Sequence, residues 1–462
     1  MVVLIQPNYN YGKAAGGWGY NPPLGLAYLA AVLERNGSRV EIIDANVENL
    51  SPKQVAEYVM EINPAFIGIS LMTTAHSYGI DIVKQLPESI MKIAGGPHAT
   101  ALPEEFLKNG FDIVIRGEGE DTILDIVNQK TAKEIIGISY KDKNGGMYHN
   151  PNRVFLNINE LPLPARHDLR NGGVDRPYFS AGNIYSPFGS IFSSRGCPYS
   201  CYYCYKDVHG FKFRARTVNN IMVEIKELVR RYGIKELDFY DDCFNYDMER
   251  ACSIMRTIKE NKLKLYIRFS NGLRIDKMNE ELLKHMHEAG VRYIAYGIES
   301  GDQNILDRIP KRLRLQQIEQ VIKMTKNIGI QVMGFFMLGL LGDTAESMQT
   351  TIEFAKKLRL DYAQFTIATP YPGTKMWKII KKDGRVSQEY NKFHHHDYGD
   401  EKWLMPEMAS HETIKKMFKR ANRQYYFRIS EILKHLKKIR NLRHIIILIR
   451  GIRRTLYSLL KR

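Results

Sequence analysis

The chain has 462 residues, which is too long for one ordinary domain, so two or three domains are expected. Apolar residues make up 44% and charged residues 25% of the sequence, as in folded globular proteins, which excludes a disordered chain. The net charge of +17 is uneven, because residues 411–462 contain 16 Lys or Arg and only two Glu. Because residues 1–410 are nearly neutral, they do not form an extended basic surface for nucleic acid, and we do not expect nucleic acid as a partner. Only the tail is basic enough to form such a surface.

No stretch near the first residue has the basic, apolar and small-residue order of a signal peptide. No apolar run approaches the roughly 20 residues that span a bilayer. We therefore expect a cytoplasmic protein. Three of the five cysteines lie within eight residues of one another, which is not the spread of a secreted disulfide framework. Cys243 and Cys252 are predicted to be ordinary thiols.

Residues 1–128 are predicted to form one domain, because short apolar runs alternate with helical patterns. This βαβ alternation predicts an open parallel α/β sheet with helices on both faces, whose ligand lies beyond the carboxyl ends of the strands. Gly37 ends a predicted helix over 23–36, and Ser51-Pro52 has the sequence of a helix start. The predicted strands are 2–5, 40–43, 66–69, 90–94 and 112–115.

Residues 129–187 are predicted to be a linker with a hairpin, in which Asn144-Gly145-Gly146 separates strands over 138–140 and 154–156. Residues 188–374 form a second βα series with six predicted strands, fewer than the eight of a closed barrel. We therefore expect a partial (β/α)6 barrel with its site at the carboxyl ends of the strands. The predicted strands are 190–194, 236–240, 265–269, 293–297, 331–338 and 362–367, and the predicted helices are 217–232, 248–261, 278–289, 302–328 and 344–359.

Residues 375–462 are predicted to be an irregular segment, 375–410, followed by a basic helical tail. Such a helix can lie in a membrane interface, bind RNA or pack on the protein. The apolar run 445–449 between basic residues favours peripheral contact with anionic lipid, and the near absence of aromatic residues among the charges argues against RNA. His394-His395-His396 is interpreted as a solvated loop, because consecutive residues do not easily converge on one metal ion.

Cys197, Cys201 and Cys204 have the spacing C-x3-C-x2-C and follow the first strand of the second series. Three thiolates in one loop can bind an iron–sulfur cluster. If that cluster has four irons, one iron lacks a protein ligand and a small molecule can chelate it. The alternative is a structural zinc site, which would need His209 or Cys243 as its fourth ligand.

With the aromatic Tyr203 before its third cysteine, this motif resembles the signature of the radical S-adenosylmethionine (SAM) superfamily. The resemblance implies a [4Fe–4S] cluster whose open iron binds the amino and carboxylate groups of SAM, and cleavage of SAM to a 5′-deoxyadenosyl radical. Later segments at strand ends also resemble the family, although for each polar residue a purely structural role at a strand end remains open. The residues implied to bind SAM are Tyr203, Asp241, Asp242, Arg268, Asn271, Glu299 and Ser300.

The amino-terminal half contains four segments of note: Pro22-Pro23-Leu24-Gly25, Met72-Thr73-Thr74, Gly95-Gly96-Pro97-His98 and Gly117-Glu118-Gly119-Glu120. In these segments it resembles the flavodoxin-like (Rossmann-type) cobalamin-binding domain of the class that contains corrinoid-dependent radical methylases and the anaerobic magnesium-protoporphyrin ester cyclase. The resemblance implies cobalamin with no histidine beneath cobalt, because no D-x-H-x-x-G occurs, and a loop over 71–74 that covers its lower face. His98 is either a catalytic acid or, as we favour, a residue that caps its loop. A fold that binds nothing is the alternative. The residues implied to bind cobalamin are Leu71, Met72, Thr73, Thr74, Gly95, Gly96, Pro97, His98, Gly117, Glu118, Gly119 and Glu120.

The two resemblances together imply a cobalamin-dependent radical methyltransferase that acts on an unactivated carbon of a small-molecule, lipid or peptide substrate. In the implied mechanism a substrate radical takes a methyl group from methylcobalamin, and a second SAM remethylates the cobalt. A flavodoxin or ferredoxin would supply electrons. The alternatives are oxidative cyclisation or rearrangement with the same cofactors, and a non-catalytic sensor with a structural metal. Methylthiolating enzymes are disfavoured, because no cysteine precedes Cys197.

Overall fold

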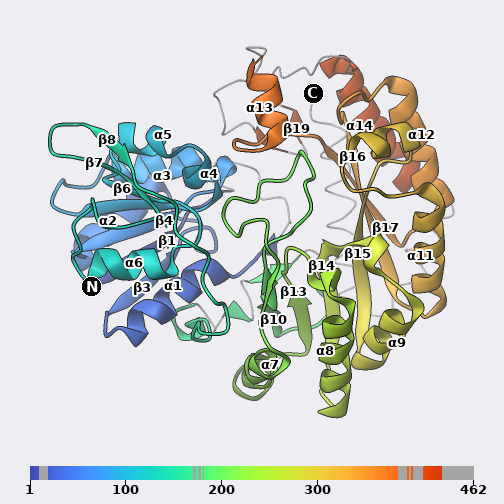
Figure 1. Ribbon diagram of the computed structural model, residues 1–462, viewed down its shortest axis with the longest axis horizontal. Coiled ribbons are helices and arrows are strands. Elements are labelled where there is room, and N and C mark those ends of the chain that lie inside the picture. Colours follow the sequence, from blue (N-terminus) through green and yellow to red (C-terminus); the bar gives the residue numbers. More distant parts are fainter. Residues whose placement is uncertain are drawn as a thin grey trace.

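The computed structural model describes residues 1–9, 19–169, 173–174, 178–180, 182–382, 393–394, 397–398 and 409–428. Two large sheets dominate it, with the first sheet and its helices at the left of Figure 1 and the second at the right. Separate apolar cores cover the two faces of the first sheet, and a third and larger core lies between the second sheet and its helices. The predicted division into two α/β halves is therefore confirmed.

The first sheet contains five parallel strands in the order β3-β1-β4-β5-β6, which is the doubly wound order of flavodoxin-like folds. Helices cover both faces, so the strands are nearly continuous apolar runs. All five predicted strands are confirmed. The strands are β1 Val2–Gln6, β3 Val40–Asp44, β4 Phe66–Ser70, β5 Met91–Gly95 and β6 Ile113–Ile115, and the helices are α1 Leu24–Arg35, α2 Pro52–Ile62, α3 His76–Val83, α4 Pro97–Ala101, α5 Pro103–Lys108 and α6 Glu120–Val127.

A hairpin of β7 Ile138–Lys141 and β8 Met147–His149 extends this sheet, because β7 pairs antiparallel with β6. The prediction of its second strand at 154–156 was wrong. The Asp142 side chain accepts hydrogen bonds from the backbone N–H groups of Asn144 and Gly146, which closes the turn early and starts the returning strand at 147. The hairpin therefore belongs to the first sheet and is not a free connector.

The second sheet has six parallel strands in sequence order, β10-β13-β14-β15-β16-β17, which confirms the partial barrel. Capping at both ends fixes helices such as α7, where the Thr217 side chain accepts from Asn220 N–H and Gly233 is left-handed. The elements are β10 Phe188–Ile191, α7 Val218–Tyr232, β13 Glu236–Phe239, α8 Met248–Glu260, β14 Tyr266–Leu273, α9 Glu280–Ala289, β15 Val291–Glu299, α10 Gln303–Arg308, α11 Leu315–Asn327, β16 Gln331–Leu338, α12 Ala345–Lys357 and β17 Tyr362–Ile367.

Two predictions within the barrel were wrong. The strand predicted over 190–194 ends at Ile191, and Ser194–Arg195 forms β11, which pairs antiparallel with β12 Arg214–Ala215. The helix predicted over 302–328 is broken into α10 and α11, because Pro310 has no N–H and holds Ile309 before it in an extended conformation.

Beyond the barrel, α13 Lys375–Lys382 is a helix where an irregular segment was predicted; Trp377 N–H donates to the Thr374 hydroxyl at its start. Helix α14, His411–Tyr426, confirms the beginning of the predicted tail helix. Its apolar face is buried and the Tyr425 hydroxyl donates to Leu360 O. The rest of the predicted tail, 429–462, and most of the His394–His396 stretch lie outside the described residues. No helix among the described residues is long and apolar enough to cross a membrane.

Candidate cofactor site

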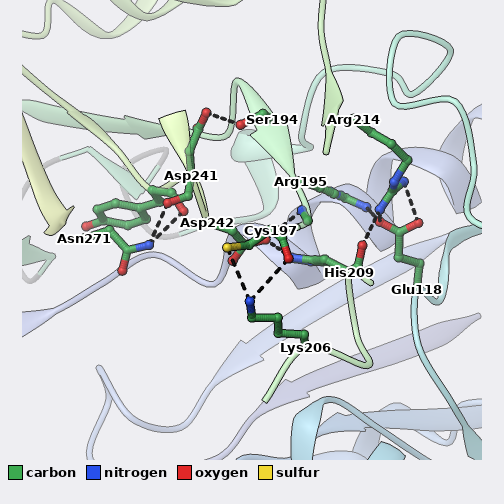
Figure 2. Close-up of polar contacts among 12 residues, drawn as sticks. Glu118, Ser194, Arg195, Cys197, Lys206, His209, Arg214, Asp241, Asp242 and Asn271 are labelled. Atoms are coloured by element: carbon green, nitrogen blue, oxygen red, sulfur yellow. Dashed lines mark hydrogen bonds and ion pairs between the residues drawn. The ribbon is translucent and has the colours of Figure 1, made fainter. Parts of the chain in front are cut away.

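The three motif cysteines lie in the loop between β11 and β12, directly beyond the carboxyl end of β10, and Figure 2 shows Cys197 in this setting. Gly196 before them has φ +82°, and a Cβ there would lie 2.3 Å from the Lys212 carbonyl oxygen. Only glycine therefore lets the chain enter the loop at this point. All three thiols are free, as an iron cluster requires.

The surroundings of Cys197 and Cys201 favour thiolates, the form that binds iron. The pKa of Cys204 is instead raised well above its usual value, first by the hydrogen bond that it donates to Cys201 and then by burial. The pKa of Cys197 is lowered to about 6, first by a hydrogen bond from the Cys243 thiol and further by Lys206, whose Nζ lies 3.4 Å from the Cys197 sulfur. The pKa of Cys201 is likewise lowered to about 6, mainly by a hydrogen bond from the Cys204 thiol. The donor set thus fits a cluster held by three cysteines.

Asp241 and Asp242 follow β13 and hold the base of the cysteine loop. The buried Asp241 carboxylate accepts from Ser193 N–H at 2.7 Å and from the Ser193 and Ser194 hydroxyls. Asp242 accepts from Gly196 N–H at 2.8 Å and lies 2.9 Å from His209 Nδ1. Both carboxylates thus hydrogen-bond the cysteine loop; Asp241 is buried there, whereas the Asp242 side chain stays 37% exposed.

Glu299 ends β15 on the same edge, where its backbone takes a left-handed φ of +71°, rare for a residue other than glycine. Lys311 Nζ donates to its carboxylate at 2.7 Å and to Gly297 O. The Tyr203 hydroxyl also hydrogen-bonds Glu299, and burial followed by this carboxylate raises the pKa of Tyr203 well above its usual value. Sequence reasoning missed Lys311; the signal was Pro310, which breaks the helix and brings the next residue to this edge.

Three further predicted SAM-binding residues differ in their positions. Asn271, near the end of β14, is exposed on the carboxyl edge and donates to Asp241 O at 2.8 Å. Ser300 is buried and hydrogen-bonds Thr351 of α12, away from the edge. Arg268 lies near the beginning of β14, fully buried, with Nη1 3.1 Å from Glu236 and its guanidinium over the Tyr293 ring. The structure therefore brings Asn271 to the cluster edge but not Ser300 or Arg268.

In the first domain, the loop over 71–74 lies beyond the carboxyl end of β4 and is braced from below. His98 N–H donates to Leu71 O, and its Nδ1 lies 3.1 Å from the Thr73 hydroxyl. A Cβ at Gly96 would lie 2.8 Å from Leu71 N, so the packing of the loop requires glycine here. His98, 1% exposed, is thus the loop brace that we favoured.

The braced loop leaves an edge with few polar side chains. Met72 is 41% exposed and Pro97 is also exposed, and Thr74, Gly95 and Gly96 are partly accessible. This edge lies beside the point where the strand order reverses between β1 and β4, the usual ligand position of doubly wound sheets. Apolar side chains and bare backbone at that position fit the flat face of a corrin ring.

The loop after β6, unlike the loop over 71–74, forms ion pairs with the second domain. Figure 2 shows Glu118 between two arginines of the second domain, Arg195 and Arg214. Glu120 is also buried and lies 2.7 Å from Arg195. Gly119 packs against Leu29 of α1. The predicted cobalamin ligands Glu118 and Glu120 therefore face the cysteine loop.

The two carboxyl edges face each other. Besides the contacts of Glu118, the Tyr240 hydroxyl beyond β13 donates to Asn21 at 2.8 Å, and an added Cβ on Gly373 beyond β17 would lie 3.1 Å from Ala101 of α4. The candidate cobalamin edge and the candidate cluster edge thus border the same region of the molecule.

Comparisons with known proteins agree with this arrangement. The model of the B12 binding domain family matches residues 18–127, and that of the Radical SAM superfamily matches residues 191–355. The fold is similar to that of TsrM from Kitasatospora setae, a radical SAM methyltransferase solved with cobalamin and a [4Fe–4S] cluster. The TM-score is 0.67 at 18% identity, and the match covers 83% of this chain and 75% of that one.

Two relatives extend the comparison to nearly the whole chain. An anaerobic magnesium-protoporphyrin IX monomethyl ester cyclase of Cereibacter sphaeroides is 24% identical, with 85% of this chain and 65% of the cyclase covered. An uncharacterised methyltransferase of Pyrococcus horikoshii is 35% identical over 427 residues, 90% of each chain. Together with the two domains, this similarity shows that the chain belongs to the cobalamin-dependent radical SAM methyltransferases.

Proposed function

We propose that this enzyme methylates an unactivated carbon of a small-molecule, lipid or peptide substrate where its two carboxyl edges meet. The observation that carries the proposal is the position of the cysteine loop, which shares one edge with Glu299 and Lys311 and contacts the loop that follows β6 of the first domain. A radical generated on the barrel and a methyl donor held by the first domain would then reach one substrate.

When bound, the cluster and SAM would supply a 5′-deoxyadenosyl radical, and cobalamin would supply the methyl group. Cys197, Cys201 and Cys204 would hold the cluster and leave one iron for SAM. Glu299 would accept hydrogen bonds from the two ribose hydroxyls, and Lys311 Nζ, which donates to its carboxylate at 2.7 Å, holds that carboxylate in place.

The remaining predicted residues support this arrangement. Asn271 is exposed at the neighbouring strand end, and its amide, which donates to Asp241 O, would also reach the carboxylate of SAM. In the first domain the loop over 71–74 would lie beneath the corrin, where Met72 provides apolar contact and His98 keeps the loop rigid.

The test is anaerobic purification with iron, sulfide and cobalamin, followed by incubation with SAM, dithionite and panels of small-molecule, lipid and peptide substrates. We expect 5′-deoxyadenosine and S-adenosylhomocysteine in equal amounts and a product heavier by one methylene unit. 5′-Deoxyadenosine with an unmethylated, oxidised or rearranged product would contradict methyl transfer and support cyclisation or rearrangement. A colourless protein that does not cleave SAM would contradict radical chemistry altogether.

The physiological reductant is proposed to be a reduced flavodoxin or ferredoxin, because cluster reduction requires a one-electron donor of low potential. Replacing dithionite with either protein should sustain formation of 5′-deoxyadenosine. Failure of both would contradict this assignment.

We also propose that the tail makes peripheral contact with an anionic membrane, and we assign this contact to the segment after α14. Helix α14 buries its apolar face on the barrel, so that face is unavailable to lipid. The full chain should sediment with vesicles of phosphatidylcholine and phosphatidylglycerol more than with phosphatidylcholine alone. Equal binding to both vesicles, or no binding, would contradict it.

A further inference from the structure

Four charged side chains join the two domains at the cysteine loop, and we call Glu118, Glu120, Arg195 and Arg214 the interdomain clasp. Arg195 Nη1 lies 3.1 Å from Glu118 Oε1, and its Nη2 lies 2.7 Å from Glu120. Arg214 donates to both Glu118 oxygens, at 2.9 and 2.7 Å. One carboxylate therefore accepts from two guanidinium groups, and two acids balance two bases.

The arginines of the clasp lie at the two ends of the cysteine loop. Arg195 is the second residue before Cys197, and Arg214 pairs with it across the β11–β12 ladder. Arg214 also donates to His209 O at 2.9 Å, and His209 is held by Asp242. A displacement of the clasp would thus move both ends of the loop that holds the cysteines.

The clasp is withdrawn from solvent and packed on rings. The Glu118 and Arg195 side chains are only 5% and 6% exposed. The Arg195 guanidinium lies 5.2 Å from the centre of the Tyr28 ring on α1, and Arg214 lies 4.8 Å from that of Phe155. Buried, fully matched charges add little net stability relative to apolar packing, but they define one geometry and penalise others.

We propose that the interdomain clasp sets the separation between the cluster and the cobalamin of the first domain, which makes Glu118 and Glu120 positioning residues and not cobalamin ligands. The inference rests on the proposed function, in which the two cofactors act on one substrate from different domains. The clasp loop follows β6 at the carboxyl edge that would carry cobalamin, and its partners flank the cysteines. It is thus a direct connection between the two edges.

The test compares Glu118→Gln with Glu224→Gln in the full chain, reconstituted with iron, sulfide and cobalamin. Glu224 is the matched control, because its buried carboxylate also bridges two arginines, Arg166 at 2.9 Å and Arg216. Those partners do not contact the loop after β6 in any hydrogen bond or ion pair of the described residues. Both changes remove one buried charge of similar exposure, so loss of stability alone affects both variants.

Two measurements separate positioning from stability. The first is the magnetic interaction between the reduced cluster and cob(II)alamin by electron paramagnetic resonance, which reports their separation without turnover. The second is the ratio of S-adenosylhomocysteine, formed by methyl transfer from SAM to reduced cobalamin, to 5′-deoxyadenosine, formed by abortive cleavage. Neither measurement needs the substrate.

In Glu118→Gln we expect a weaker or broader magnetic interaction, and a product ratio that falls by up to about 100-fold, as for a misplacement of about 1 Å. Glu224→Gln should keep both parental values, and Glu118→Asp should recover part of the ratio. If Glu118→Gln keeps the parental magnetic interaction and product ratio, the clasp does not set the separation of the cofactors. Arg214→Lys keeps the positive charge but loses the two parallel hydrogen bonds of the guanidinium to Glu118. If Glu118→Gln does not fold, Arg214→Lys must show the same changes, or the inference is wrong. A parental protein that binds neither cofactor would contradict the proposed function instead.

Discussion

The two sheets of this enzyme share an alternating βα plan but use their carboxyl edges differently. Where its strand order reverses, the first sheet presents Met72, Pro97 and glycine backbone, and His98 is buried beneath the loop over 71–74. Glu118 and Glu120, farther along the same edge, are taken up by arginines of the second domain. The second presents cysteines, Glu299 and Lys311, and nearly every one of these polar groups has a partner. An apolar edge suits a large flat cofactor, whereas a charged edge suits a cluster and a small zwitterion. The difference is made by side chains at strand ends and not by topology.

The sharpest test of the charged edge is Cys201→Ala, because two thiolates cannot retain the cluster. We expect iron to be lost after anaerobic reconstitution and formation of 5′-deoxyadenosine to fall below detection. Iron analysis and visible absorbance measure the first effect. Cys252→Ala on α8 is the control and should keep its iron. Full iron content in Cys201→Ala would refute the assignment of the ligands.

The partner of Glu299 provides the next test. Lys311→Met removes a buried charged hydrogen bond worth about 1.5–3 kcal/mol, so the affinity for SAM should fall by about 10–150-fold. Equilibrium binding to the reconstituted protein measures it. Arg314→Met breaks a neighbouring ion pair whose two side chains are 69% and 50% exposed, and it should change the affinity little. Equal effects of the two changes would contradict a specific role for Lys311.

On the apolar edge the corresponding test is His98→Leu, which removes the hydrogen bond to Thr73 that braces the loop over 71–74. One neutral hydrogen bond contributes about 1 kcal/mol, so cobalamin affinity should fall by only about fivefold. The change in affinity is measured as the amount of cobalamin, read from its absorbance, that stays with the protein during gel filtration. The control is His167→Leu, a more exposed histidine beside Glu34, which should bind cobalamin as the parent does. Unchanged retention in His98→Leu would show that the loop does not depend on its brace.

The smallest effect is expected for Cys243→Ala. Its thiol hydrogen-bonds the Cys197 sulfur, and such bonds stabilise the added negative charge of a reduced cluster. The variant should keep its iron, and the reduction potential should fall by about 40 mV, equivalent to about 1 kcal/mol for one electron. Redox titration measures it. Loss of iron would instead identify Cys243 as a ligand.

Local patterns were sufficient to predict the strands of both sheets, with two exceptions: β8, which lies earlier in the chain than predicted, and the first strand of the barrel, which ends early. Apolar periodicity and turn residues act over a few positions, and the cysteine spacing lies within one loop. The errors occur where a side chain redirects the backbone. Asp142 closes a turn early, Asp241 draws the chain off β10, and Pro310 divides a helix.

From the sequence alone came the two α/β halves, the three cysteines proposed to hold the cluster and the chemistry that their motif implies. Tertiary structure alone decided which strand-end residues meet. Glu118 pairs with arginines 77 and 96 positions away, Lys311 reaches Glu299 across a helix break, and Arg268 stays near the other end of its strand. A motif specifies residue types along the chain, but the direction of a side chain depends on turns and on partners that are distant in sequence. Charged groups in particular lie where an opposite charge compensates for the loss of water.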